Sequence, residues 1–296
     1  MARRSHYKRL AVGVAQDEHV LEAVSKAQQE GIAEAILVGD RRKIEEGATR
    51  CGIDLSGMRI IDEPDDHAAA MKAVRLVHDG EADMYMKGCI DTRSFLKSIL
   101  DKDCGLRTEK LLSHVAVFDI EGCDHLLFLS DVAFIPYPTL DEKRGIIENT
   151  VEVAHACGIA TPKVAALAAV EVVNPKMQCT VEARQLSDMN KHGEITGCIV
   201  DGPLSFDLAT VPEAAKHKNA EDRAIVGDAD VLIFPDIQAG NITYKCLSHQ
   251  TRHESGCILT GTSAPAILTS RADDAETKVN SIALAAVVAE RMRATA

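Results

Sequence analysis

Tryptophan is absent from the 296-residue chain, and aromatic residues make up only 3% of it. Proteins that bind single-stranded nucleic acid stack the bases on aromatic side chains, so the composition argues against such a function. Positive charge is also scarce, because 33 lysines and arginines face 45 acidic residues and leave a formal net charge of −12. A chain this acidic repels nucleic acids and anionic membranes, and we expect neither as a partner.

Long apolar runs and paired cysteines are missing as well. No apolar run approaches the roughly 20 residues that a membrane-spanning helix needs, and the run LAVGVA after the basic N-terminus is too short for a signal peptide. The nine cysteines are scattered without a single CxxC pair. This pattern is typical of reduced thiols rather than of a disulfide framework, and it predicts a cytoplasmic protein.

Several catalytic signatures are also lacking. The chain contains no GxGxxG, no GxxxxGK and no GxSxG. His249 and His253 have the spacing of a metal-binding helix, but HQTRH lacks the glutamate of a zinc protease. We therefore expect no bound metal.

What the chain does have is a regular alternation of apolar runs and helical patterns, with 46% hydrophobic residues to fill a core. Runs such as RLAVGVA, EAILVGD and ADMYMKG alternate with amphipathic stretches such as HAAAMKAVRLVHDG. This order predicts an α/β fold with mostly parallel sheets. The closely spaced runs at 111–120 and 124–131 predict an antiparallel portion. Two alternating blocks predict two domains with a cleft between them.

The junction APAILTSRADDAETK carries a hydroxyl and a guanidinium between an apolar run and a helical pattern. A helix that begins here would present free backbone N–H groups, so Ser270 and Arg271 suit a phosphate. The alternative is structural: Ser270 caps the helix, Asp273 completes a capping-box-like pattern, and the acids complement the helix dipole.

Two further strand ends carry cations. In FPDIQAGNITYK, Gly240 and Asn241 predict a tight turn, and Lys245 follows at a distance from which it can reach an anion. The alternative is an ordinary turn with a surface lysine.

In YMKGCIDTRSF, the glycine allows close backbone approach, and a hydroxyl and two cations can hold phosphate oxygens. The residues concerned are Lys87, Gly88, Thr92 and Arg93. The alternative is a loop that leads to a helix cap at Asp91 or Thr92.

The segment CIVDGPLSFDLA ends a predicted strand at Asp201, Gly202 and Pro203, with Asp207 beyond them. Its residues fit the lining of a cleft and a structural turn equally well.

Taken together, these segments resemble the phosphate acetyltransferase/phosphate butyryltransferase family, and the butyryltransferase branch most closely. The resemblance is carried by MKGCIDT, GLRTEKLLSHVAVFD, TPKVAALAAVEVVNPKM, IVDGPLSFDLA, ADVLIFPDIQAGNITYK and ILTSRADDAETKVNSIALA. It implies the two-domain αβα architecture of isocitrate and isopropylmalate dehydrogenases, with the active site in the interdomain cleft. Domain I would comprise 1–103 and 261–296, and domain II 104–260. The family is usually homo-oligomeric, so a homodimer or larger assembly is expected.

The resemblance also implies a reaction, the reversible transfer of a short-chain, butyryl-like acyl group between coenzyme A and inorganic phosphate, which yields an acyl phosphate. Both compounds are substrates, and no cofactor is expected. Ser270 and Arg271 would bind the phosphoryl group and the reacting carbonyl oxygen, and Thr92 and Arg93 would contact phosphate. The remaining predicted site residues are Lys87, Gly88, Asp131, Gly202, Pro203, Gly240, Asn241 and Lys245.

The general base is left open among Glu276, Asp274 and Asp131. One stretch departs from the family pattern: SDVAFIPYP keeps Asp131 but has Ile135 where the family has an asparagine. Two alternatives follow. The chain could be a non-catalytic or altered-specificity relative that binds acyl-CoA, or an NAD-dependent decarboxylating dehydrogenase on the same fold. The second would need clustered metal-binding aspartates, which the sequence does not show.

Overall fold

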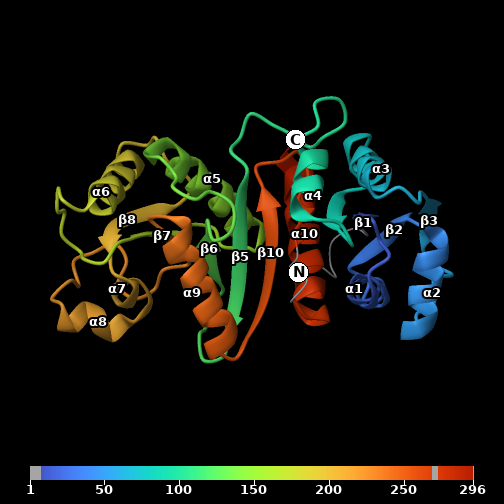
Figure 1. Cartoon of the computed structure of the whole chain (residues 1–296). Helices are drawn as coiled ribbons and strands as arrows, with labels where there is room; N and C mark the ends of the chain where they lie inside the picture. Colours follow the sequence, from blue (N-terminus) through green and yellow to red (C-terminus); the bar gives the residue numbers. More distant parts are fainter. Residues whose placement is uncertain (1–7, 269–272, 296) are drawn as a thin grey trace. The chain divides into compact units, whose positions relative to one another are not determined.

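The computed structural model describes residues 8–268 and 273–295, and its chain forms two compact units (Figure 1). Unit 1 comprises Met1–Leu112 and Ser255–Ala296, and unit 2 comprises Ser113–Glu254. The boundaries expected from the sequence, after residues 103 and 260, lie within several residues of these divisions.

Unit 1 contains a sheet whose first five strands run parallel. β10 is antiparallel to β11, which pairs in parallel with β4. The strand order in this unit is β3 (Arg59–Asp62), β2 (Ala33–Gly39), β1 (Lys8–Gly13), β4 (Met84–Lys87), β11 (Ala266–Ile267) and β10 (His253–Thr260).

The helices of unit 1 begin where short acidic side chains cap them. An aspartate precedes each of the first four helices and accepts a backbone N–H from its first turn, which is the strongest local signal for a helix start. These helices are α1 (Glu18–Gln29), α2 (Arg41–Cys51), α3 (Asp66–His78) and α4 (Thr92–Ile99); the last helix of the unit is α10 (Ala275–Thr295).

Unit 2 combines a hairpin with a parallel sheet. β5 (Ser113–Ile120) and β6 (Leu127–Ser130) pair in antiparallel fashion, which confirms the predicted antiparallel portion. β6 is followed across the sheet by three parallel strands, which are β9 (Val231–Ile233), β7 (Lys163–Leu167) and β8 (Ile199–Leu204). The α/β class with mostly parallel strands is therefore confirmed.

The helices of unit 2 correct one prediction. They are α5 (Leu140–Ala156), α6 (Gln178–Lys191), α7 (Phe206–Thr210), α8 (Pro212–His217) and α9 (Ile237–Gln250). The tight turn predicted at Gly240 and Asn241 is wrong, because both residues lie inside α9. Asp236 caps this helix by accepting the N–H groups of Gln238 and Ala239, both at 2.9 Å. The local cap therefore outweighs the turn preference of the glycine–asparagine pair.

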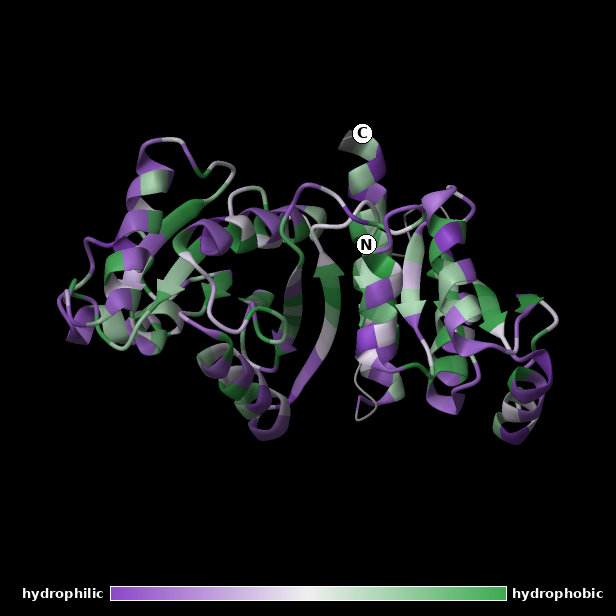
Figure 2. Cartoon of the chain, turned by 45° about the horizontal axis from the view of Figure 1, so that its top comes forward, coloured by the Kyte–Doolittle hydropathy of each residue, from purple (hydrophilic) through white to green (hydrophobic). Residues whose placement is uncertain are grey.

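Aliphatic side chains fill both cores, as the low aromatic content requires. Figure 2 shows hydrophobic residues concentrated on the strands and hydrophilic residues on the outer faces of the helices. Among the described residues, no helix combines the length and the apolar character needed to cross a membrane.

Candidate active-site elements

The predicted site residues divide among three parts of the chain. Ser270 and Arg271, the principal catalytic candidates, lie outside the described residues. The Lys87–Arg93 loop and Glu276 belong to unit 1, whereas Asp131, Gly202, Pro203 and the α9 residues belong to unit 2. A cleft shared by these groups stays a prediction, and each group is described within its own unit.

The tip of β4 is built by close backbone contact. Lys87 is the last residue of this strand and is only 6% exposed. Directly after it, the N–H of Gly88 donates to the carbonyl of Gly13 at 2.9 Å. A Cβ at Gly88 would lie 2.2 Å from the carbonyl oxygen of Val14. Because no larger residue fits this contact, glycine is required here for the fold of the tip.

The first turn of α4 follows this tip. Asp91 caps the helix by accepting the N–H of Ser94 at 3.0 Å, and hydrogen bonds from the Ser94 side chain and backbone lower the pKa of its carboxyl group. Asp91 is therefore the cap, which was one of the two positions left open by the sequence. Thr92 and Arg93 are the first two residues of α4, and both are exposed.

An open hollow of about 750 Å³ runs along α4. Its walls combine leucine side chains with three cations, and the lining residues are Thr92, Arg93, Leu96, Lys97, Leu100, Asp101 and Lys102. Arg93 and Lys97 form no ion pair with any residue in the described part of the chain. Three cations against one carboxylate, that of Asp101, leave an excess of positive charge beside apolar surface, a combination that suits an anion with an organic portion.

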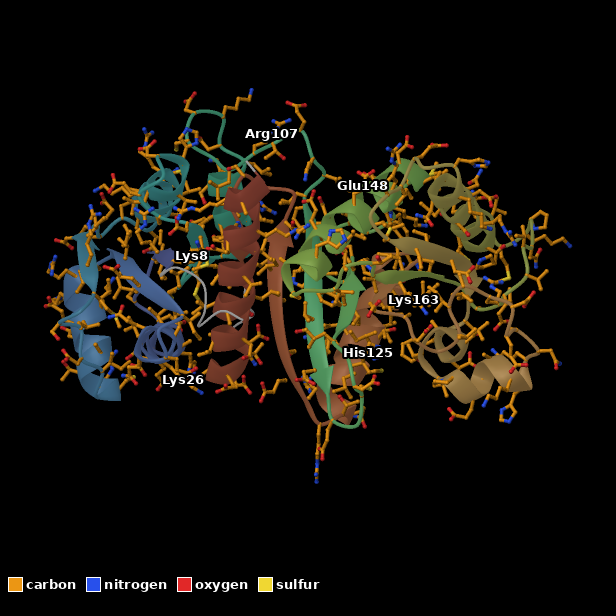
Figure 3. The ribbon with its side chains drawn as sticks, turned by 180° about the vertical axis from the view of Figure 1, so that it is seen from behind. Lys8, Lys26, Arg107, His125, Glu148 and Lys163 are labelled. Carbon is orange, nitrogen blue, oxygen red and sulfur yellow. The ribbon has the colours of Figure 1, made fainter. Side chains whose placement is uncertain are left out.

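The candidate bases near the start of α10 have structural partners. Asp274 accepts the N–H of Thr277 at 2.8 Å and so caps α10. Glu276 forms an ion pair with Lys26 of α1, and the side chain of Glu276 is 49% exposed. Lys26 is labelled in Figure 3. The structural alternative named the wrong cap, because Asp274 and not Ser270 caps α10.

Asp131, the third candidate base, organises the loop after β6. Its buried carboxylate accepts three backbone N–H groups, from His114 at 3.0 Å and from Ala133 and Phe134 at 2.8 Å each. These bonds fix the loop that carries Ile135. A structural role therefore accounts for Asp131 without a ligand.

The structure brings this loop together with the start of α9. A Cβ at Gly240 would lie 2.5 Å from the carbonyl oxygen of Asp131, so the glycine allows the helix to approach the loop. The amide of Asn241 donates to the carbonyl of Val132 at 2.9 Å. Lys245 lies one turn after Asn241 on the same face of α9 and is exposed. No local pattern in the sequence predicts these contacts, which join segments about a hundred residues apart.

Gly202 and Pro203 lie inside β8 and are buried. A Cβ at Gly202 would meet the Cβ of Ala166 at 2.8 Å and the carbonyl oxygen of Ala183 at 3.0 Å. This packing between β7 and α6 gives the glycine a structural reason that is independent of any substrate. Their predicted role in substrate binding stays a prediction.

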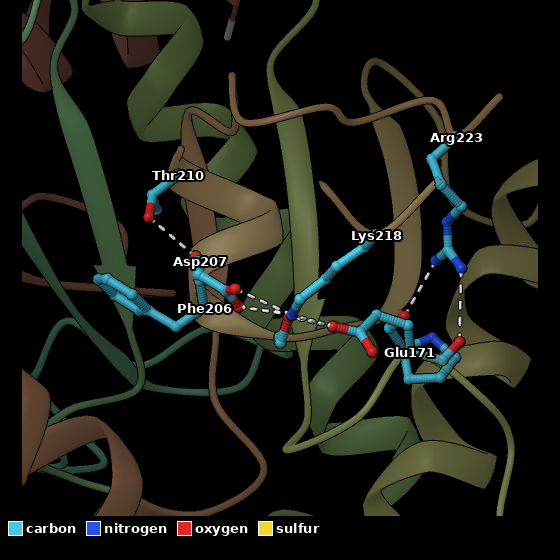
Figure 4. Close-up of polar contacts among 8 residues, drawn as sticks. Glu171, Phe206, Asp207, Thr210, Lys218 and Arg223 are labelled. Atoms are coloured by element: carbon cyan, nitrogen blue, oxygen red, sulfur yellow. Dashed lines mark hydrogen bonds and ion pairs between the residues drawn. The ribbon is translucent and has the colours of Figure 1, made fainter. Parts of the chain in front are cut away.

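A polar network lies at the tip of β8 (Figure 4). The ammonium group of Lys218 donates to Glu171 at 2.6 Å, to Ser205 at 2.8 Å and to Asp207 at 2.9 Å. Hydrogen bonds from Ser205 and Lys218 lower the pKa of Asp207 to about 2.

A second ion pair lies beside this network. Arg223 holds Asp201 through two bonds of 3.0 and 2.8 Å. Sequence reasoning overlooked Lys218 and Arg223, although both follow the acidic positions within the next 25 residues.

Metal binding finds no support in the described part of the chain. No group of three His, Cys, Asp or Glu side chains there could hold a metal ion. His249 lies in α9 and His253 in β10, so the two histidines do not share a helix face.

Both units have the α/β fold, and the hollow along α4 in unit 1 carries exposed cations that suit an anionic ligand. The family model described as "Phosphate acetyl/butaryl transferase" matches residues 1–71 and 66–286. The chain belongs to this family of acyltransferases.

Individual relatives agree with this assignment. The chain is 55% identical to phosphate butyryltransferase of Clostridium acetobutylicum over 95% of this chain and 93% of that protein. It is 44% identical to phosphate acetyltransferase of Thermotoga maritima over 97% of both chains. The crystal structure of a branched-chain phosphotransacylase from Enterococcus faecalis superposes with a TM-score of 0.85 at 32% identity, covering 95% of this chain and 99% of that one.

Proposed function

We propose that the protein transfers a butyryl or similar short-chain acyl group reversibly between coenzyme A and inorganic phosphate. The observation that carries this proposal is the 55% identity to a phosphate butyryltransferase over nearly the whole of both chains. The 44% identity to a phosphate acetyltransferase leaves the acyl chain as the finer question. Coenzyme A and phosphate are then substrates, and the reaction requires no cofactor.

In the direction that forms acyl phosphate, a phosphate oxygen attacks the thioester carbonyl and the coenzyme A thiolate departs. The tetrahedral intermediate carries an oxyanion, and the loss of one positioned donor to such an oxyanion typically costs about 2.7–4 kcal/mol of barrier. The family resemblance gives this role to Arg271, with Ser270 beside it. No covalent enzyme intermediate is needed, because orientation of the two substrates supplies much of the rate enhancement.

The cations along α4 support binding of the phosphate-bearing substrates. Arg93, Lys97 and Lys102 line one hollow with Leu96 and Leu100 between them. Guanidinium and ammonium groups bind phosphate oxygens through charge-assisted hydrogen bonds. We propose that this surface contributes to binding of phosphate or of coenzyme A.

The direct test measures thiol release from acyl-CoA substrates of two to six carbons, with and without phosphate. We expect phosphate-dependent release with a maximum near four carbons. Binding of acyl-CoA without turnover at any chain length would favour the non-catalytic alternative. A reduction of NAD with hydroxy acids and a divalent metal would favour the dehydrogenase alternative.

The loop after β6 offers a variant that tests the acyl chain preference. Ile135 is half-buried in the loop that Asp131 and Asn241 hold in place. Each buried methylene contributes about 0.8 kcal/mol, so two methylenes correspond to about a tenfold preference. We expect Ile135→Asn to lower the ratio of butyryl to acetyl turnover by about tenfold. An unchanged ratio would place the acyl chain elsewhere.

We propose a homodimer or larger homo-oligomer as the functional form. Light scattering on the purified protein tests this directly, and the mass of a single chain would contradict it.

A further inference from the structure

The tips of β1 and β4 form the switch point of the sheet in unit 1. The chain leaves β1 towards β2 on one side, and β4 lies on the other side of β1. The two following helices lie on different faces, since α1 packs against α2 and α10 whereas α4 packs against α3. In open α/β sheets, ligands bind in the crevice outside the strand ends at such a point. The Lys87–Arg93 loop begins at this crevice.

Val14, the first residue after β1, has an unusual backbone at this crevice. Its φ is 58°, in the left-handed region, and its side chain is fully buried. A left-handed conformation is rare for any residue with a Cβ and is a genuine outlier for a β-branched one. Such strain persists only where the surrounding structure holds it, and it concentrates at functional sites.

The contacts of Val14 show what the left-handed turn achieves. The N–H of Gly88 donates to the carbonyl of Gly13 at 2.9 Å, and the N–H of Cys89 donates to the carbonyl of Val14 at 2.7 Å. Two consecutive carbonyls of the β1 tip therefore accept two consecutive N–H groups of the loop after β4. The N–H of Ala15 donates to the carbonyl of Val38 at 3.0 Å, which fixes the tip on its other side.

We propose that Val14 is a positioning residue whose left-handed backbone holds the β1 tip as a template for the Lys87–Arg93 loop. A glycine at position 14 would adopt the same left-handed conformation without strain, but its backbone could also change to other conformations. The buried branched side chain of Val14 prevents that movement, so Lys87 and the first turn of α4 stay in one place. The identity of the anion that this loop binds rests on the proposed function.

The first test needs no variant. Hydrogen exchange in the wild-type protein should show the amides of Gly88 and Cys89 protected as strongly as those of β4. Rapid exchange at both amides would overturn the proposal at once, whether or not the protein has the proposed activity.

The second test compares Val14→Gly with Val14→Ala. Both lose the branched side chain, but only glycine removes the left-handed strain. We expect Val14→Gly to unfold at the same temperature as Val14→Ala or higher, because its strain is relieved. We nevertheless expect faster exchange at Gly88 and Cys89 and a KM for phosphate raised by about three- to tenfold, the worth of one weakened hydrogen bond.

Val12→Ala is the matched control, because Val12 is an equally buried valine two residues earlier, inside β1. It should lose stability without a change in the KM for phosphate. If Val14→Gly merely follows the two alanine variants in every readout, Val14 is a packing residue and the proposal is wrong. If the wild type lacks phosphate-dependent thiol release, the proposed function fails, and the exchange rates alone decide the role of Val14.

Discussion

The tips of β4 and β8 both combine a glycine with charged residues in the sequence, yet the structure pairs the charges at the β8 tip and leaves the cations of α4 at the β4 tip exposed. At the β4 tip, Gly88 is pressed against backbone carbonyls, and the exposed cations of α4 have no ion-pair partner among the described residues. At the β8 tip, Lys218 bonds Glu171 and Asp207, and Arg223 bonds Asp201. The cations of α4 at the β4 tip are therefore available to a ligand, whereas those at the β8 tip are already paired with carboxylates of the protein.

This difference shows that charged residues at a strand end do not by themselves indicate a binding site. At the β8 tip, Asp201 and Asp207 were predicted from the sequence as possible lining of a cleft. Both carboxylates form ion pairs within the protein. At the β4 tip, by contrast, backbone contacts determine the shape and leave the side chains of α4 exposed. Variants at the two tips should therefore affect different properties.

The largest expected effect is that of Gly88→Ala at the β4 tip. The added Cβ would lie 2.2 Å from the carbonyl oxygen of Val14 and 2.7 Å from that of Gly13, so the backbone must shift. A displacement of about 1 Å in a positioning element costs about 100-fold in rate. We expect kcat/KM for phosphate to fall by at least about this factor, with a loss of about 1–3 kcal/mol in the free energy of unfolding.

Gly57→Ala is the control, because the nearest atom to its added Cβ is the end of the flexible Gln28 side chain. It should change neither the rate nor the stability measurably. A fully active Gly88→Ala would mean that the β4 tip is not part of the site.

Arg93→Ala tests whether the exposed charge of α4 is used. Hydrogen bonds to charged groups contribute about 1.5–3 kcal/mol, so its loss should raise the KM for phosphate or coenzyme A by about tenfold or more. The stability should hardly change, because Arg93 is exposed. Arg42→Ala provides the comparison: this arginine is exposed on α2 and pairs with Glu46. If the two variants have the same KM values, Arg93 does not contribute to substrate binding.

Lys218→Met tests the opposite expectation at the β8 tip. The change leaves Glu171 and Asp207 without their cation, and since exposed pairs contribute about 0.2–1 kcal/mol each, we expect a loss of about 1 kcal/mol in the free energy of unfolding by urea. The kinetic constants should stay unchanged. Lys216→Met, which removes an exposed lysine of α8, is the control. A variant that is stable but inactive would contradict the distinction between the two tips.

The sequence predicted the features that depend on local pattern. Alternating apolar and helical runs predicted the α/β class, and Asp91 was one of two predicted cap positions because the signal for a cap lies within three residues. The features that it did not reveal depend on contacts between distant segments. From the sequence alone, Gly240 has the signal of a turn residue, and only the structure shows its close contact with the backbone of Asp131. Val14 likewise has the signal of an ordinary strand residue, and only the structure shows its left-handed backbone. The pairing of Lys218 with Glu171 spans 47 residues and has no local signal.

The smallest expected effect concerns the dependence of stability on acid at the β8 tip. The pKa of Asp207 falls from 3.8 to about 2 through hydrogen bonds from Ser205 and Lys218, and that of Glu171 is also lowered, because bonds from Lys218 and Ser205 outweigh its partial burial. A lowered pKa in the folded state stabilises the protein above the unfolded value, and this stabilisation disappears as the pH falls through the folded value.

The contribution of Asp207 should therefore be complete above about pH 4 and be lost between there and about pH 2. It is modest, since half of the side chain is exposed to solvent. Urea unfolding between pH 5 and pH 3 should show a smaller loss of stability for Asp207→Asn than for the wild type. Asp222→Asn, which alters an exposed acid nearby, should follow the wild type. If the two variants behave alike, the network at the β8 tip does not hold Asp207 in its charged form, and the contrast between the tips rests on the β4 side alone.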